Sequence, residues 1–186
     1  MSQRSGPTTI AYERVGQIVA IAHADCPPAD AEWKAYLALL ERSVPSVTGI
    51  LVTTDGAAPD AGQRAAMARL LAKVGGRFRT AVITSSRVAR GVVTLMGWFN
   101  SDIRAFEPDE LSVAFDHLGV ADPYAREHLR RRLLMLRIQM VMPTGEGLAS
   151  ELASSELGTV DALLAQSPAA LKKEVLRRSG RPPAAR

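Results

Sequence analysis

Residues 47–90, VTGILVTTDGAAPDAGQRAAMARLLAKVGGRFRTAVITSSRVAR, decide the fold of this chain. Two short apolar runs within them, Gly49–Thr54 and Thr80–Thr84, have the composition of strands that are buried on both faces. Between these runs, Ala61–Val74 repeats apolar residues at helical spacing, and Asp60 is placed to cap that helix. A strand, a helix and a second strand in this order favour a parallel crossover. The stretch therefore predicts the centre of an α/β sheet.

The same alternation of strands and helices continues on both sides of this stretch. Towards the N-terminus we expect a hairpin of Ile10–Arg14 and Gln17–Ala24, followed by a helix over Ala31–Arg42 with Asp30 as its cap. Towards the C-terminus we expect a helix that reaches Phe99, a short strand at Ile103–Phe106 and a helix from Pro108 to Leu118, ended by Gly119. The sequence therefore predicts an α/β fold with a mostly parallel sheet of about five strands, an N-terminal hairpin and flanking helices.

Beyond Ala121 the strand pattern ends and only helical patterns follow. Pro123–Met142 has the period of one long amphipathic helix. Shorter helices are expected at Gly147–Ser155, Val160–Ala165 and Pro168–Arg178. We therefore expect a disordered lead (residues 1–9), an α/β domain (10–120), an all-helical extension (121–180) and a disordered end (181–186).

Composition places the chain among soluble globular proteins. Hydrophobic residues make up 47% and charged residues 23% of the sequence, which is enough apolar material for a core. The single cysteine, Cys26, excludes a disulfide or a thiolate metal cluster within one chain. The N-terminus lacks the apolar run of a secretory signal, and no window approaches the ~20 apolar residues of a membrane span. We therefore expect a cytoplasmic, bacterial protein with no transmembrane segment.

Positive charge is concentrated in the helical extension. Residues 123–186 hold 11 basic and 6 acidic residues, whereas residues 1–122 hold 12 and 13. The long helix carries Arg126, Arg130, Arg131 and Arg137, and clustered guanidinium groups bind the phosphates of nucleic acids or membranes. The helix has no interleaved aromatic residues and no known DNA-binding motif. We therefore favour an interaction helix whose Leu/Met stripe packs on the domain or on a second copy, with its arginines in water.

Polar residues follow both central strands. The candidate ligand- or partner-binding residues are Thr54, Asp55, Ser85, Ser86, Arg87 and Arg90. The carboxyl ends of parallel strands meet at one edge of a sheet, where helix N-termini attract anions. A phosphate, a carboxylate or an acidic side chain is therefore the expected ligand, although Asp55 disfavours a strongly anionic one. The alternative is that these residues only cap helices, form turns and meet solvent.

Sequence motifs for catalysis are absent. The chain contains no GxGxxG, no GxxxxGK[ST] and no GxSxG pattern. The three histidines, His23, His117 and His128, fall on different predicted elements without the spacing of metal ligands. Cys26 lies in a turn that offers no reason for a lowered thiol pKa. We therefore predict no catalytic residue, no metal ion and no cofactor, and expect a protein that is not an enzyme.

The order of predicted elements over residues 10–120 resembles the STAS-type fold of anti-sigma-factor antagonists. Three segments carry the resemblance: GILVTT (49–54) before a capped helix, TAVITSS (80–86) before another, and IRAFEPDELSVAFDHLGV (103–120) as the closing short strand and helix. The resemblance implies a non-enzymatic regulatory or protein-interaction module, whose partner is a protein or a second copy of the chain.

The resemblance also implies where a regulatory phosphorylation site would lie. In these antagonists a serine that follows an aspartate, at the start of the helix after the strand similar to GILVTT, is phosphorylated by a partner kinase. This chain has Asp60-Ala61-Gly62 there, so the usual acceptor hydroxyl is missing. Two other functions stay open: a small-molecule or lipid carrier with a cavity between the sheet and the tail helices, and a nucleic-acid-associated protein that works through the Arg-rich helix.

Overall fold

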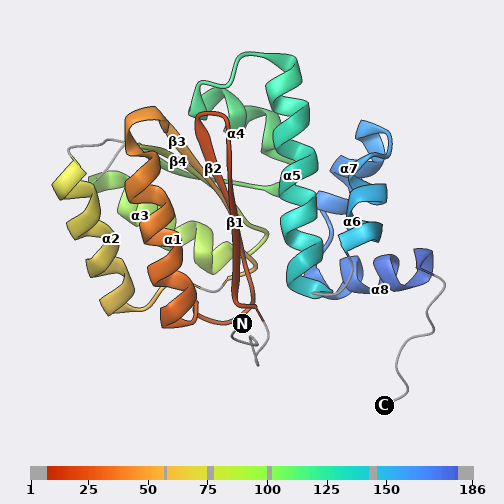
Figure 1. Ribbon diagram of the computed structural model, residues 1–186, viewed down its shortest axis with the longest axis horizontal. Helices are drawn as coiled ribbons and strands as arrows, with labels where there is room; N and C mark the ends of the chain where they lie inside the picture. Colours follow the sequence, from red (N-terminus) through yellow and green to blue (C-terminus); the bar gives the residue numbers. More distant parts are fainter. Residues whose placement is uncertain (1–7, 57, 75–77, 100–101, 143–145, 180–186) are drawn as a thin grey trace.

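Five strands form one sheet around which the helices are arranged (Figure 1). The computed structural model describes residues 8–56, 58–74, 78–99, 102–142 and 146–179. The strands are β1 (Ile10–Val15), β2 (Ile18–His23), β3 (Gly49–Thr53), β4 (Arg79–Ile83) and β5 (Ile103–Phe106). The α-helices are α1 (Asp30–Ser43), α2 (Ala61–Val74), α3 (Arg87–Phe99), α4 (Leu111–Leu118), α5 (Pro123–Val141), α6 (Glu146–Ala153), α7 (Leu157–Leu164) and α8 (Pro168–Arg178), with 3-10 turns at Val44–Ser46 and Pro108–Glu110. The predicted α/β class is confirmed.

The strands lie in the sheet in the order in which they occur in the chain. β1 and β2 are antiparallel and pair Val15 with Ile18 beside the turn that joins them. β2, β3, β4 and β5 are parallel, and Thr53 at the end of β3 pairs with Ile83 at the end of β4. The predicted hairpin and mostly parallel sheet are therefore confirmed, and the carboxyl ends of four strands meet at one edge.

Each face of the sheet has its own hydrophobic core. On β2, Val19 and Ile21 face a core that includes Trp33, Tyr36 and Leu40 of α1. The alternate residues of β2 face the other side of the sheet, where they share a core with α4 and α5. These residues are Ile18, Ala20 and Ala22. Every residue of β2 is buried, which explains why its sequence is almost continuously apolar.

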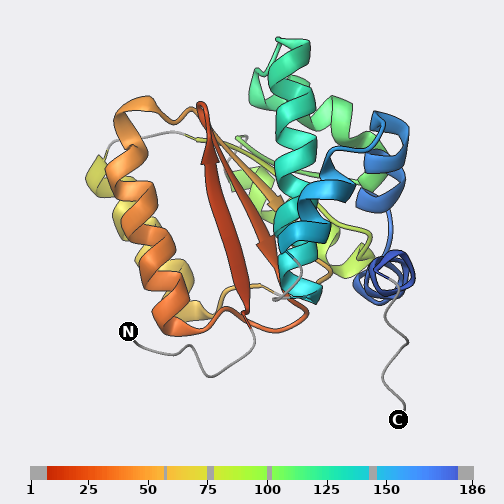
Figure 2. The same cartoon turned by 45° about the vertical axis from the view of Figure 1, so that its right-hand side comes forward.

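The helical extension is built onto the second face of the sheet. α4 lies against β3, β4 and β5, and α5 lies against β1 and β2. Figures 1 and 2 show α1 and α2 on one side of the sheet and α5 on the other, with α6, α7 and α8 on the far side of α5. One hydrophobic core runs from Phe115 of α4 through Leu133 of α5 to Leu163 and Leu171. The extension therefore shares a core with the sheet.

Two predicted helix boundaries are confirmed and others differ, since α7 begins at Leu157 where Val160 was predicted, and α4 begins at Leu111 after the 3-10 turn at Pro108–Glu110. Gly119 ends α4 in the left-handed conformation, with φ of 76°, and the Asp60 carboxylate accepts a hydrogen bond from Gln63 N at 2.8 Å. The prediction that Asp30 caps α1 is wrong. Ala29 occupies the cap position, and Asp30 is the first helical residue, whose carboxylate accepts a hydrogen bond from Gln63 Nε2 at 3.1 Å. A contact with α2 thus replaces the local cap.

Two further observations concern the ends of the chain and membrane spans. The expected disordered ends fall largely on residues 1–7 and 180–186, which lie outside the described residues. Thr9, also within the expected lead, donates a hydrogen bond from its backbone N–H to Glu32 Oε2 at 2.8 Å. No helix in the described part of the chain is long and apolar enough to cross a membrane.

Candidate functional site at the carboxyl edge of the sheet

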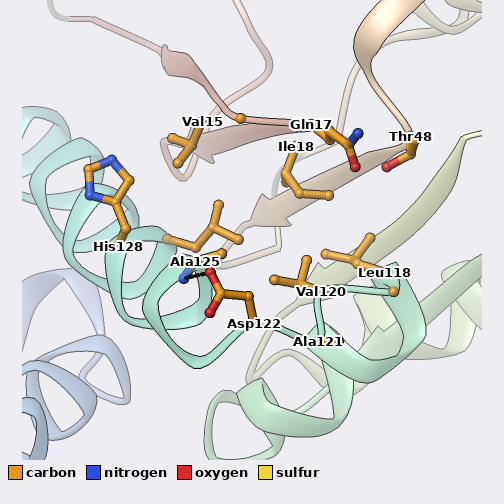
Figure 3. A pocket seen from close by; sticks show the side chains of 13 residues that line it. Val15, Gln17, Ile18, Thr48, Leu118, Val120, Ala121, Asp122, Ala125 and His128 are labelled. Carbon is orange, nitrogen blue, oxygen red and sulfur yellow. Dashed lines mark hydrogen bonds between the residues drawn. The ribbon is translucent and has the colours of Figure 1, made fainter.

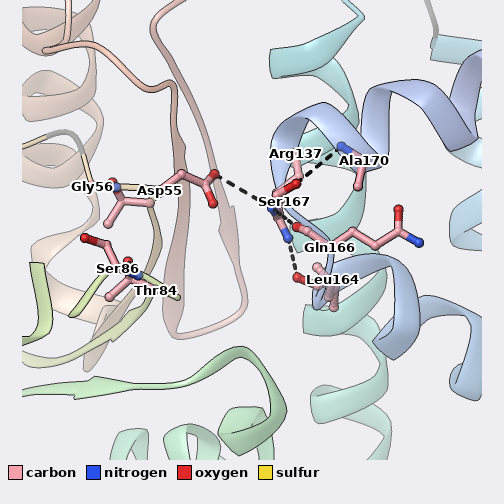
Figure 4. Close-up of polar contacts among 10 residues, drawn as sticks. Asp55, Gly56, Thr84, Ser86, Arg137, Leu164, Gln166, Ser167 and Ala170 are labelled. Atoms are coloured by element: carbon pink, nitrogen blue, oxygen red, sulfur yellow. Dashed lines mark hydrogen bonds and ion pairs between the residues drawn. The ribbon is translucent and has the colours of Figure 1, made fainter. Parts of the chain in front are cut away.

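The loops that follow β3 and β4 lie side by side at the carboxyl edge of the sheet (Figure 4). Thr54 N donates a hydrogen bond to Ile83 O at 3.1 Å, which continues the pairing of the two strands into their loops. A Cβ atom added to Gly56 would lie 3.5 Å from Ser86 Oγ. The structure therefore brings together the two groups of polar residues that the sequence placed after separate strands.

Most hydroxyl groups at this edge are used within the loops themselves. The Thr54 hydroxyl is buried and accepts a hydrogen bond from Gly56 N at 3.3 Å. In the next loop, buried Thr84 accepts from Ser86 N at 3.1 Å, and Ser86 Oγ accepts from Ala89 N at 3.2 Å. Of Ser85 and Ser86, the two residues expected to cap this helix, Ser86 is therefore the cap of α3, and the hydroxyl groups chiefly fix the shape of the two loops.

The three remaining polar candidates, Ser85 in the β4–α3 loop and Arg87 and Arg90 in the first turn of α3, differ in what they contact. Ser85 and Arg87 are exposed. Arg90 forms an ion pair with Glu107, which follows β5, so its charge is directed towards a neighbouring carboxylate. Glu107 is a residue that the sequence analysis missed, and it also takes part in a capping box with Glu110. Of the predicted anion-binding arginines, Arg87 is the one that faces solvent at this edge.

Asp55 and Arg137, which the sequence assigned to two different sites, meet in the structure. Arg137 comes from α5 and is 7% exposed. Its Nη2 atom lies 3.8 Å from Asp55 Oδ2 and donates a hydrogen bond to Gln166 O at 2.7 Å. Its Nη1 atom donates to Leu164 O at the end of α7 (Figure 4). One guanidinium group therefore connects the β3–α2 loop, α5 and the α7–α8 connection.

Burial and charge act against each other in this pair. Loss of solvent raises the pKa of Asp55, the Arg137 charge opposes that rise, and the nearby Asp25 carboxylate adds to it. Burial likewise lowers the pKa of Arg137, and the Asp55 charge opposes that change. Asp55 is consequently a weaker acid than an aspartate in water. The positive charge of Arg137 also partly offsets the repulsion between the Asp55 carboxylate and an anionic ligand at this edge.

The other predicted arginines of α5 also contact carboxylates of the same chain. Arg126 pairs with Asp116, Arg130 Nε lies 3.0 Å from Asp161 Oδ1, and Arg131 Nη2 lies 2.6 Å from Glu127 Oε1. The Arg130 guanidinium also lies over the Phe115 ring, 4.9 Å from its centre. The Arg131–Glu127 pair lies within α5, but Arg131 Nη1 also donates a hydrogen bond to Ser155 O at 2.7 Å. Arg126, Arg130 and Arg131 therefore hold α5 to neighbouring elements, whereas we expected them in water.

A second polar cluster lies between the loop after β2 and the start of α2. Gln63 is buried, and its Nε2 atom donates a hydrogen bond to Pro28 O at 2.7 Å. Gln63 O accepts a hydrogen bond from Trp33 Nε1 at 3.1 Å. His23 ends β2, and its ring centre lies 6.3 Å from that of Trp33. The three-residue spacing of Asp60 and Gln63 matches a capping box. This sequence signal could have identified Gln63 as a residue with a structural role at the start of α2.

His23 is the buried histidine of this region. It is 8% exposed, and no residue in the described part of the chain pairs with its Nδ1 atom. Burial lowers the pKa of His23 from 6.5 to about 4, so the ring is neutral at pH 7. Cys26, three residues further on, is exposed. Among the described residues, no group of three or more His, Cys, Asp and Glu side chains has the arrangement of a metal site.

Comparisons with known proteins found no relative of this chain. No protein-family model matches the sequence, and no match was found among curated proteins or solved structures.

Proposed function

We propose that this protein is a regulatory or protein-interaction module, similar in its order of elements to STAS-type domains, which binds a protein partner and catalyses no reaction. The observation that carries the proposal is the exposure of two apolar side chains beside the carboxyl edge. Val88 is 79% exposed and Val92 is 51% exposed, and both lie on α3, directly after the β4–α3 loop. Exposed apolar side chains that are grouped together mark interaction surfaces more often than isolated ones do.

The surroundings of these valines fit a protein interface. Val88 and Val92 are four residues apart and therefore lie on the same side of α3. Ser85 and Arg87, both exposed, precede them at the start of the helix, and Gly56 contributes the neighbouring loop. We call these five residues the carboxyl-edge surface. An apolar centre with hydrogen-bonding and charged groups at its margin is the usual organisation of a protein interface.

Phosphorylation at the usual position is not part of this proposal. α2 begins at Ala61, the residue that stands at the acceptor position in the register of the resemblance, and alanine has no hydroxyl group. Thr53 and Thr54, the nearest hydroxyl groups before it, are 6% and 7% exposed. Neither of these two hydroxyl groups is accessible to a kinase, so neither Thr53 nor Thr54 replaces the missing acceptor at position 61.

Photo-crosslinking tests the proposal. A photo-reactive amino acid at position 88 should give a discrete adduct with one partner in a lysate of the source organism. Val92→Glu should lower the yield of that same adduct by at least about tenfold, because a charge would be buried in the interface. Val113, which is 53% exposed on α4, provides the matched control, and Val113→Glu should leave the yield unchanged.

Two results would overturn the proposal. The first is an equal adduct yield from Val92→Glu and Val113→Glu, which would show that the carboxyl-edge surface is not the interface. The second is turnover of a metabolite by the purified protein that is lost on Asp55→Ala. Sedimentation velocity on the purified chain distinguishes a second copy from a different protein as the partner.

The nucleic-acid alternative receives less support from the arginine contacts. The predicted arginines of α5 each lie within ion-pair distance of a carboxylate of the same chain. A guanidinium group that already faces a carboxylate contributes less to phosphate binding, since counterion release scales with the phosphates that are neutralised. We therefore expect no low-salt gel shift with DNA or RNA, whereas binding that is abolished by replacing Arg130, Arg131 and Arg132 would favour this alternative.

A further inference from the structure

A cavity of about 380 Å³ opens at the amino edge of the sheet, opposite the carboxyl-edge surface (Figure 3). It lies between the β1–β2 turn, Thr48 before β3, and the α4–α5 connection. Its volume falls within the range of small-molecule sites, roughly 300–1,000 Å³. The cavity is thus enclosed by the first strands of the sheet on one side and by the first helix of the extension on the other.

Two backbone features shape the floor and one wall of the cavity. β3 begins at Gly49, where an added Cβ atom would lie 2.9 Å from Ile18 Cδ1 and 3.0 Å from Leu118 Cδ2. The absence of a side chain there lets Ile18 and Leu118 meet beneath the cavity. Gly119 then ends α4, and the chain crosses to Asp122 before α5 begins. This connection forms the opposite wall.

The chemistry of the lining combines an apolar floor with polar groups at the margin. The apolar side chains are Val15, Ile18, Leu118, Val120, Ala125 and Leu129. Gln17, Thr48 and His128 are exposed at the margin, and within the described residues no hydrogen bond engages their side chains. These groups offer an amide, a hydroxyl and an imidazole to a bound molecule.

Charge at the cavity favours a neutral ligand. The Asp122 carboxylate lines the cavity and accepts hydrogen bonds from Tyr124 N at 3.2 Å and Ala125 N at 3.1 Å. Its negative charge opposes an anion, and the positive end of the α5 dipole, which Asp122 caps, offsets part of that charge, so a cation gains little here. An uncharged head group therefore fits the margin best, and an apolar body fits the floor.

We propose that this cavity binds a small, uncharged amphiphilic molecule, with its apolar body on Ile18, Leu118 and Leu129 and its hydrogen-bonding head towards Gln17, Thr48 and His128. This site is separate from the carboxyl-edge surface, so it stands whether or not that surface binds a partner. Apolar burial supplies most of the affinity, and the polar margin sets the orientation of the ligand.

Titration with N-phenyl-1-naphthylamine tests the proposal, because this probe is uncharged, apolar and carries one N–H donor. The 186-residue chain should enhance its fluorescence saturably with one site per chain. Ala125→Trp places an indole in the cavity and should weaken binding by at least about tenfold. Ala72 is exposed on α2, on the other side of the sheet, and Ala72→Trp should bind as the wild type does.

Amide chemical shifts of the wild-type protein provide a second measurement that needs no folded variant. Addition of the probe should shift the signals of Gln17, Thr48 and Gly119. The proposal is overturned by the absence of saturable binding, by equal binding to a folded Ala125→Trp protein, or by shifts that instead cluster on α3 or another distant element.

Discussion

At the scale of single residues, a buried guanidinium must replace the water that would otherwise solvate its charge, and Arg137 does so with three partners. Two are the backbone carbonyls of Leu164 and Gln166, and the third is the Asp55 carboxylate. Leu164 ends α7, where the helix dipole favours a positive charge. The two carbonyl groups satisfy hydrogen-bond geometry, and Asp55 supplies the opposite charge at longer range.

Replacing Asp55 by asparagine should therefore destabilise the fold. Asp55→Asn leaves the Arg137 charge buried without its carboxylate, but it also removes the desolvation cost of the Asp55 charge. We therefore expect the free energy of unfolding to fall by no more than about 1–2 kcal/mol, below the ~3–5 kcal/mol of a closely bonded buried pair. Urea unfolding at pH 7 measures the loss. In the Arg137→Met background the same Asp55 substitution should instead raise the free energy of unfolding, because it removes a carboxylate that has lost its partner, and an equal loss in both backgrounds would refute the coupling.

A matched surface pair provides the control for this experiment. Asp116 pairs with Arg126 and its side chain is 64% exposed. Asp116→Asn removes the same charge at a position where water can replace the partner, so a loss below about 1 kcal/mol is expected. The difference between the two asparagine variants isolates the contribution of burial.

His23 predicts a specific dependence of stability on pH. Its pKa is about 4 in the folded protein against 6.5 as the ordinary value, so the unfolded chain binds more protons between these two values. The stabilisation from neutral His23 is complete above pH 6.5 and is lost as pH falls towards 4. Between pH 7 and pH 5 the loss should be about 2 kcal/mol.

Urea unfolding at pH 7, 6 and 5 tests this contribution. His23→Leu fills the site with an apolar side chain that takes up no proton, so its unfolding free energy should fall less steeply over this range. His128→Leu, at an exposed position, should retain the slope of the wild type. A wild-type slope in His23→Leu would show that other groups cause the acid sensitivity.

At the scale of secondary-structure elements, local sequence signals were sufficient to predict the type and order of the strands and helices of the sheet. Residues that stop or start an element mark several of the boundaries. Gly119 and the Asp122–Pro123 pair stop one helix and start the next, and the apolar runs of β3 and β4 identify buried strands. The prediction of the α1 cap was wrong for a physical reason. Asp30 accepts a hydrogen bond from Gln63 of α2, and a contact between residues 33 positions apart cannot be predicted from the residues that flank Asp30.

The start of α5 allows a test of one such boundary. Asp122 accepts hydrogen bonds from the backbone N–H groups of Tyr124 and Ala125, which have no partner within the helix. Asp122→Ala should reduce the free energy of unfolding by about 1 kcal/mol, and Asp122→Asn should recover most of it. Denaturant unfolding of both variants is the measurement. Equal losses would indicate that the negative charge matters more than the hydrogen-bonding cap.

At the scale of the whole molecule, the sequence could predict which residues lie at the carboxyl edge but not what they contact. Thr54 and Ser86 could be placed together because parallel strands end at the same edge. The contact of Asp55 with Arg137 depends on where the extension packs, and no periodicity within α5 reports that position. The cavity at the amino edge arises in the same way, from the packing of α5 against the β1–β2 turn.

Removal of the last three helices should unfold the protein, because they belong to the core of the sheet. The buried apolar side chains that residues 143–186 contribute include Ala149, Leu152, Val160, Leu163, Leu164, Leu171 and Val175. At roughly 1.5–3 kcal/mol for each large side chain, their total is on the order of 10 kcal/mol, which equals the stability of many whole domains.

Circular dichroism during heating distinguishes the outcomes. A chain that ends at Met142 should show no cooperative unfolding transition, whereas a chain that lacks only residues 180–186 should unfold as the 186-residue chain does. A cooperative transition in the shorter chain would show instead that the sheet and α5 form an independently stable unit.

The position of α5 against β1 and β2 also affects how the protein emerges from the ribosome. Arg132 Nε on α5 lies 2.7 Å from Glu13 Oε2 on β1, although the two residues are 119 positions apart in the chain. At a translation rate of about 5–20 residues per second, the second face of the first strands waits roughly ten seconds for its covering helix. During that interval the nascent chain presents an uncovered apolar face, a form that chaperones bind before the fold can close.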